Sequence, residues 1–196
     1  MKNPAQKIKD NLPGLLLAFK KLSEQEVLVG VPAGAGGPDG SDANYASIAY
    51  WQDNGAPEAN IPARPFMKPG IKSVQREVAV CFKQAAQKAL EDKEDKEEVG
   101  KYLIKAGLIA SSAIKNHIDE GIPPPLADST LRARARGKPG IKISKGAKLE
   151  IEERAARVAG GMTADEARAS DTLDNTTPLV ITGGLRNSIT FVVKES

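Results

Sequence analysis

The chain has 196 residues, a net charge of +3 and 40% hydrophobic residues, which suits one domain with a core of its own. Aromatic residues make up only 4%, so that core must be built from Ile, Leu, Val and Ala. The single cysteine, Cys81, excludes an intrachain disulfide and fits a protein folded in a reducing cytoplasm. No apolar run is long enough to span a membrane, and the N-terminus lacks the pattern of a signal peptide.

The N-terminal part of the chain predicts a helix and then a strand. Apolar residues at helical spacing indicate an amphipathic helix over 3–22, and a β-branched run indicates a strand over 26–31. The glycine-rich tract 33–41 follows as a loop. Asp42 is a suitable N-cap for the next helix, over 43–53.

The central part predicts two long helices between proline-rich segments. Asn54-Gly55 ends the preceding helix, and prolines hold 61–66 extended. The strongest helical periodicity covers 69–91, where Pro69 opens the helix and Cys81 lies on the apolar stripe as a buried thiol. A charged run then separates this helix from a second one over 98–118, which ends before Pro123-Pro124-Pro125.

The C-terminal part predicts short elements. In chain order these are a helical turn over 131–136 capped by 128–130, a strand over 141–144, a helix over 149–158, a helix to 169 opened by a capping box at Thr163, a helical turn at Leu185 and a strand over 189–194. We expect an α+β fold in which 27–31 and 189–193 belong to one antiparallel or mixed sheet packed against the two long helices.

The sequence offers little from which to build an active site. The glycines of 33–41 lack the Gly-Lys-Ser/Thr that a phosphate-binding loop needs. His117 is the only histidine, and its position at a helix end favours a surface or capping role over a place in a catalytic triad. With one histidine and one cysteine a zinc site is implausible, and no acidic cluster has the spacing of a calcium loop. We therefore expect no catalytic residues, no metal and no cofactor; an enzyme such as a small hydrolase would rest on chain size alone.

One basic stretch stands out from the weakly basic background. Seven cations follow Asp128 with no acid among them: Arg132, Arg134, Arg136, Lys138, Lys142, Lys145 and Lys148. The glycines of this stretch predict a mobile loop that could touch phosphates, but no aromatic residue is interleaved for base stacking. A solvated or partner-facing loop and a loop lining a DNA passage both remain open, whereas sequence-specific binding is not indicated.

Two segments carry a resemblance to a known family. The first runs from Tyr50-Trp51-Gln52-Asp53-Asn54-Gly55 to Ile61-Pro62-Ala63-Arg64-Pro65-Phe66, and the second is Pro178-Leu179-Val180-Ile181-Thr182-Gly183-Gly184-Leu185-Arg186-Asn187-Ser188-Ile189. Together with the proline turn and Ser/Thr-Leu helix start of 122–131, they resemble the neck and tail-completion proteins of long-tailed bacteriophages, the tail-component and virion-morphogenesis families. The order agrees over about 45–196, but the proline turn lacks the Trp often found there. A helical hairpin at 149–170 looks inserted.

The resemblance implies a single tail-completion-like domain over 1–196, with an insertion at 137–175. It implies a non-enzymatic virion protein, made in the host cytoplasm, that forms a six-fold or twelve-fold ring at the head–tail junction or tail terminus with other neck, connector or tail-tube proteins. Five residues are expected at the subunit interface: Trp51, Arg64, Phe66, Leu185 and Arg186. In the ring, the basic stretch would meet DNA in the channel or a neighbouring ring. The alternative function is a DNA-binding or DNA-packaging accessory protein that uses the 132–148 loop.

Overall fold

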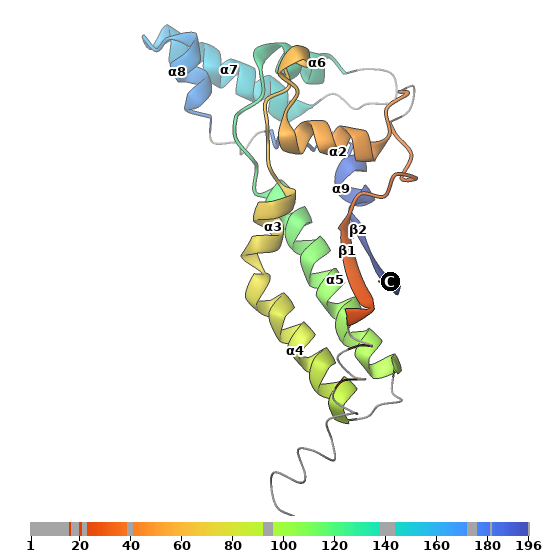
Figure 1. The fold of residues 1–196 in the computed structure, drawn as a ribbon. Helices are drawn as coiled ribbons and strands as arrows, with labels where there is room; N and C mark the ends of the chain where they lie inside the picture. Colours follow the sequence, from red (N-terminus) through yellow and green to blue (C-terminus); the bar gives the residue numbers. More distant parts are fainter. Residues whose placement is uncertain are drawn as a thin grey trace, which may run out of the picture. The chain divides into compact units, whose positions relative to one another are not determined.

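Figure 1 shows the fold of the chain in a computed structural model, which describes residues 16, 20, 23–38, 41–91, 96–137, 144–171, 176–180 and 182–195. Several predicted features lie outside the described residues. These are the helix expected over 3–22 apart from residues 16 and 20, the strand expected over 141–144 apart from its last residue, and Lys138 and Lys142.

The chain divides into two compact units. Unit 1 comprises Met1–Gly30, Gly70–Ala113 and Thr190–Ser196, and unit 2 comprises Val31–Pro69 and Ile114–Ile189. At the coarse level the structure is mostly helical with a small antiparallel sheet, so the expected α+β class holds. The single domain with an insertion at 137–175 stays a prediction.

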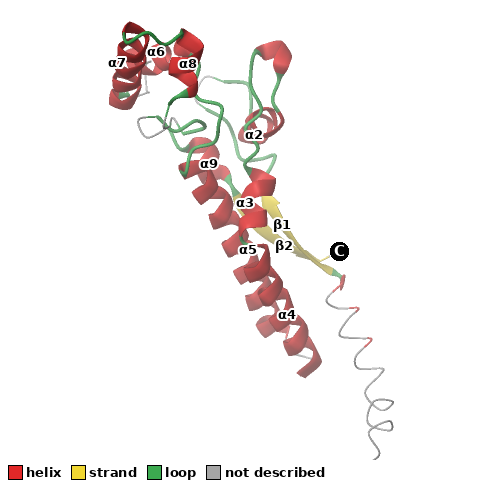
Figure 2. Cartoon of the chain, turned by 90° about the vertical axis from the view of Figure 1, so that its left-hand side faces the viewer, coloured by secondary structure: helices red, strands yellow, loops and turns green. Residues whose placement is uncertain are grey.

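Unit 1 contains the sheet and most of the length of the two long helices (Figures 1 and 2). Strand β1, Gln25–Gly30, pairs antiparallel with β2, Thr190–Glu195, in the register Val27↔Val193. Side chains alternate along both strands, and Val27 and Val193 pack on a buried cluster from helices α4, Gln75–Glu91, and α5, Lys96–Asp119. That cluster consists of Ala85, Val99 and Leu103. The predicted pairing of the N-terminal and C-terminal strands against these helices is confirmed.

Helix α5 lies unusually close to the sheet. A Cβ added to Gly107 would fall 2.2 Å from the ring of Phe191 on β2, a distance that real side chains do not reach. Glycine at this position therefore lets the aromatic ring rest directly on the helix backbone. Cys81 is buried and free, as expected for an inert core thiol.

The prediction of a single helix over 69–91 is wrong in one respect. The segment forms two helices, α3, Met67–Ser73, and α4, with a turn at Val74. The Ser73 hydroxyl donates to the Gly70 carbonyl at 2.7 Å, and Val74 N–H donates to the Ile71 carbonyl at 3.2 Å. Both bonds tighten the last turn of α3 and compete with the helical ladder.

Unit 2 begins with helix α2, Tyr45–Asn54, and the short 3₁₀ helix η1, Pro57–Ala59. The N-cap of α2 is Asn44, whose side chain accepts Ser47 N–H at 2.8 Å, so the expected cap at Asp42 is wrong. The loop sets this start, because Tyr45 N–H donates to the Gly36 carbonyl at 2.6 Å. Gly55 ends α2 with φ 82°, as its sequence position predicts.

The later elements described in unit 2 are helices. It contains α6, Asp128–Arg136, α7, Lys145–Ala159, α8, Ala164–Ala169, and α9, Gly184–Ser188. Helix α6 begins at Asp128 without a side-chain cap, so the expected cap by 128–130 is wrong. The capping box at Thr163 is confirmed in both of its hydrogen bonds. Ser144, expected in a strand, instead caps α7 by accepting Ala147 N–H at 3.1 Å.

A separate buried cluster joins α6 to α7. It consists of Leu126, Leu131 and Ala147, with Ala135 and Ile151 packed against it. Helix α7 therefore shares its core with α6 rather than standing apart from it. Among the described residues, no helix is both long and apolar enough to cross a membrane.

Candidate functional site

The Ile-Pro-Ala-Arg-Pro-Phe segment folds inward, around Arg64. The Arg64 side chain crosses to the proline turn, where Nε and Nη2 donate to the Pro124 carbonyl at 3.0 and 2.8 Å and Nη2 reaches the Pro125 carbonyl at 3.4 Å. Arg64 is 5% exposed and Phe66 is fully buried. Proline N atoms carry no hydrogen, so the turn presents carbonyl acceptors without competing donors. Arg64 thus ties two motifs far apart in sequence.

Asp53 fixes the same segment from the other side. Its Oδ1 accepts the backbone N–H groups of Phe66 and Met67 at 2.7 and 3.0 Å and so caps the start of α3. The sequence interpretation did not single out Asp53. A carboxylate in the last turn of a helix such as α2 interacts unfavourably with the helix dipole. This unfavourable position was the one indication in the sequence that Asp53 has a partner outside the helix.

The two glycines of the Thr-Gly-Gly-Leu segment have different structural roles. Gly183 has φ 76° at the N-cap of α9, a conformation that favours glycine. A Cβ on Gly184 would fall 2.0 Å from the Tyr45 hydroxyl, so this glycine allows α9 to approach α2. Leu185 then points into the core and is 6% exposed.

Arg186 pairs within the chain. Its Nε donates to both carboxylate oxygens of Asp119, at 2.7 and 2.9 Å, and its Nη2 donates at 2.6 Å. This bidentate arrangement raises the pKa of Arg186 through the hydrogen bonds from its guanidinium to Asp119. The pair joins the end of α5 to α9 at the surface.

Of the five residues expected at a subunit interface, only Trp51 shows a large exposed apolar surface, at 41%. Arg64, Phe66 and Leu185 are buried in their own unit, and Arg186 is half-exposed in its pair with Asp119. Arg64 and Phe66 therefore do not form a presented patch, and Phe66 is a core residue. An indirect role in supporting a nearby interface stays a prediction.

A cleft of about 540 Å³ opens where these motifs meet. Its walls come from α2, the extended segment, the proline turn, α6 and the C-terminal signature. The lining includes apolar side chains of Ile48, Ile61, Leu126, Leu179 and Leu185. Among the described residues, the charged side chains of its lining are three arginines, Arg64, Arg134 and Arg168. Such a concave, largely apolar site with a few converging polar groups is typical of ligand pockets.

Arg134 is the most perturbed of these arginines. Its Nη1 donates to the Thr177 carbonyl at 3.2 Å, while its Nε is buried without a hydrogen-bond partner in the described part of the chain. Burial, and then the nearby positive charge of Arg64, lower the pKa of Arg134 to about 10. Burial alone lowers the pKa of Arg64. Two cations therefore share one partly dry site.

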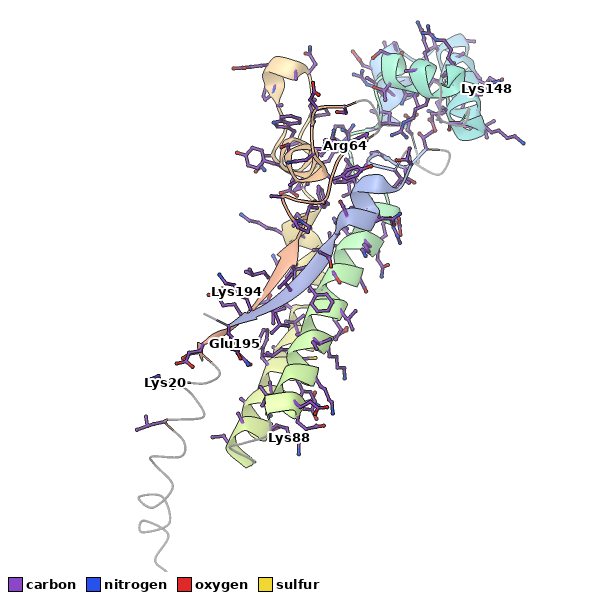
Figure 3. The ribbon with its side chains drawn as sticks, turned by 90° about the vertical axis from the view of Figure 1, so that its right-hand side faces the viewer. Lys20, Arg64, Lys88, Lys148, Lys194 and Glu195 are labelled. Carbon is purple, nitrogen blue, oxygen red and sulfur yellow. The ribbon has the colours of Figure 1, made fainter. Side chains whose placement is uncertain are left out.

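The basic stretch is not one mobile loop as expected. Arg132, Arg134 and Arg136 lie on helix α6, and Lys145 and Lys148 lie on α7, where Figure 3 labels Lys148. Successive positions of a helix turn by about 100°, so Arg134 faces opposite Arg132 and joins the buried Leu131 side. Arg132, Arg136, Lys145 and Lys148 are exposed, and no salt bridge holds them within the described residues.

A second arginine cluster holds α6, α7 and α8 together. Arg154 donates to Asp128, to Asp171 and, at 2.8 Å, to the Leu126 carbonyl. Arg157 donates at 2.7 Å both to the second Asp171 oxygen and to the Ala167 carbonyl. Burial raises the pKa of Asp171, but hydrogen bonds, led by that from Arg154, outweigh it and lower the pKa below its usual value. Sequence reasoning missed this network, because its members lie on three separate elements.

The described residues contain no group of His, Cys, Asp and Glu side chains placed to hold a metal ion. His117, in the last turn of α5, lies 3.3 Å from a Glu120 oxygen, as its position at a helix end suggested. Comparisons of the chain with protein-family models, curated proteins and solved structures find no match.

Proposed function

We propose that the chain is a structural subunit of a tailed-bacteriophage virion, of the neck or tail-completion kind, which assembles as a ring at the head–tail junction or tail end. The proposal rests on the resemblance of its two signature segments and on one structural observation. Unit 1 exposes apolar side chains on the outer face of its sheet, where a monomer in water would leave them uncovered.

The outer sheet face carries a directly paired apolar couple. Leu28 and Val192 lie opposite each other in the register of β1 and β2, on the face turned away from the helices. They are 52% and 54% exposed. Helix α5 adds Ile104 and Leu108, which lie one turn apart and are 46% and 52% exposed. A second copy of the chain is the occupant that a ring supplies for such surfaces.

The signature segments support the same function through their roles in the fold. The main residues of these segments either fix the backbone or allow two elements to approach closely, and none presents a nucleophile or a proton-transfer pair. They are Asp53, Arg64, Gly183 and Gly184. A subunit with fixed neighbours requires such a fixed backbone geometry.

Solution mass tests the proposal. Light scattering across a range of protein concentrations should show oligomers of the unmodified chain, and the double change Leu28→Lys and Val192→Lys should shift the mass toward the monomer. Val158→Lys is the matched control, because Val158 is also apolar and 45% exposed but lies on α7. All variants should keep their melting temperatures. If the sheet-face variant assembles like the control, the outer sheet face is not the contact.

A DNA-binding or DNA-packaging accessory role is the second candidate. The observation in its favour is a set of exposed cations on α6 and α7 that form no salt bridge with described residues: Arg132, Arg136, Lys145 and Lys148. This function requires salt-dependent duplex binding by the isolated chain, with each phosphate contact adding to the salt slope. Replacing these four residues by Gln should then abolish binding, whereas the ring proposal requires no duplex affinity of the free chain.

A further inference from the structure

The charged lining of the cleft in unit 2 is one-sided. Among the described residues, three arginines line this cleft and no Asp or Glu does. Arg168 is already paired with Asp165 at 2.9 Å. Arg64 and Arg134 have only carbonyl acceptors among the described residues, so no carboxylate in this part of the chain offsets their two positive charges.

The hydrogen-bond donors of this pair are only partly used. Arg64 commits Nε and Nη2 to the proline turn, and its Nη1 makes no hydrogen bond to a described residue. Arg134 commits Nη1 to Thr177, and its buried Nε has no acceptor within the described residues. A buried N–H of a cation without an acceptor is costly. Arg134 also lines the cleft, so an oxyanion bound there would place a negative charge beside its guanidinium. The planar guanidinium suits a carboxylate better than a point charge does.

We propose that this cleft is a binding site for a carboxylate carried on an apolar peptide segment of a partner protein, with Arg134 and the neighbouring Arg64 as its anion-binding pair. The inference goes beyond the proposed function, because it assigns a ligand class to one cleft and holds whether or not the chain forms a ring.

The walls of the cleft select the peptide over a nucleic acid. The side chains of Ile48, Ile61, Leu126 and Leu179 offer apolar surface beside the arginines, which suits the aliphatic neighbours of an acidic residue. A nucleic-acid duplex is hydrated and too wide to enter a cleft of this size. Phosphates would meet the exposed cations of α6 and α7 first. The volume of about 540 Å³ lies within the range that holds small ligands, so a few side chains fit.

Nuclear magnetic resonance of the arginine Nε–Hε groups in the full chain tests the proposal. The probes are the blocked tripeptide acetyl-Leu-Asp-Leu-amide, its Asn counterpart and inorganic phosphate, each titrated to millimolar concentration. We expect the Asp peptide to move the Arg134 resonance in a saturable way, and the Asn peptide and phosphate to leave it in place. Arg134→Gln should weaken binding of the Asp peptide at least tenfold, measured on the backbone amides of the cleft. Arg134→Lys keeps the charge but loses the planar guanidinium, so its affinity for the Asp peptide should lie between those of the unmodified chain and Arg134→Gln.

Arg132→Gln is the matched control, since Arg132 is an exposed arginine on the same helix and should bind the Asp peptide like the unmodified chain. The melting temperatures of the variants show that the fold is retained. The proposal is overturned if the Asp peptide leaves Arg134 unmoved, if the Asn peptide or phosphate moves it equally, or if Arg134→Gln and Arg134→Lys both bind like the control.

Discussion

Replacing Arg64 by Met tests most directly whether the Arg64 side chain holds the proline turn in place. Methionine keeps an apolar stem of similar length but removes the three hydrogen bonds to the Pro124 and Pro125 carbonyls. Hydrogen bonds to charged groups contribute about 1.5–3 kcal/mol each, and the Pro124 carbonyl would lose both of its donors. Removing the charge also ends the desolvation that lowers the pKa of Arg64, which offsets part of the loss. We expect the free energy of unfolding to fall by about 2–4 kcal/mol.

Urea unfolding followed by the fluorescence of Trp51 measures this loss, because Trp51 is the only tryptophan and belongs to the same unit as Arg64. Arg64→Lys should lose less than Arg64→Met, since an ammonium keeps the charge but not the fork. Arg186→Met is the control: it removes a surface pair worth at most about 1 kcal/mol. If Arg64→Met proves no more destabilising than Arg186→Met, Arg64 does not hold the proline turn.

Three further predictions concern the fold around the site. Phe66→Ala should lower the free energy of unfolding by about 3–5 kcal/mol in urea titrations, because Phe66 is fully buried; a loss below about 1 kcal/mol would contradict its core position. Because the pKa of Asp171 is lowered by its arginine partners, its contribution is present above about pH 4 and disappears as pH falls through the lowered pKa. Asp171→Asn should thus reduce the melting temperature at pH 7 and flatten its acid dependence, and an unchanged profile would refute the network. Gly184→Ala should destabilise by about 1–3 kcal/mol through overlap with Tyr45, whereas Gly34→Ala, with open space around it, should leave the melting temperature unchanged.

The parts of the fold that depend on local signals followed from the sequence. The Val-rich runs gave both strands and their shared sheet, because one face of each must be buried against an apolar helix stripe. The capping box at Thr163 and the glycine end of α2 at Gly55 carry their own backbone requirements, so no knowledge of distant contacts was needed.

The rest depended on choices between near-equal neighbours or on distant partners. Asp42 and Asn44 can both cap a helix, and a bond from Tyr45 to the loop at Gly36 decides between them. In the sequence, nothing distinguishes Arg134 from Arg132 and Arg136. Only the helical geometry of α6 places Arg134 on the opposite face from Arg132. The partners of Arg64 lie at the proline turn, far along the chain, and no local pattern specifies that contact.

The position of the chain in an assembled particle tests the central claim. Gold-labelled antibodies against this chain, applied to tailed particles from the cells that produce it and viewed by electron microscopy, should mark the neck or the tail end. Purified particles that carry no label, or label spread over the capsid, would contradict the assignment to a neck or tail-completion ring.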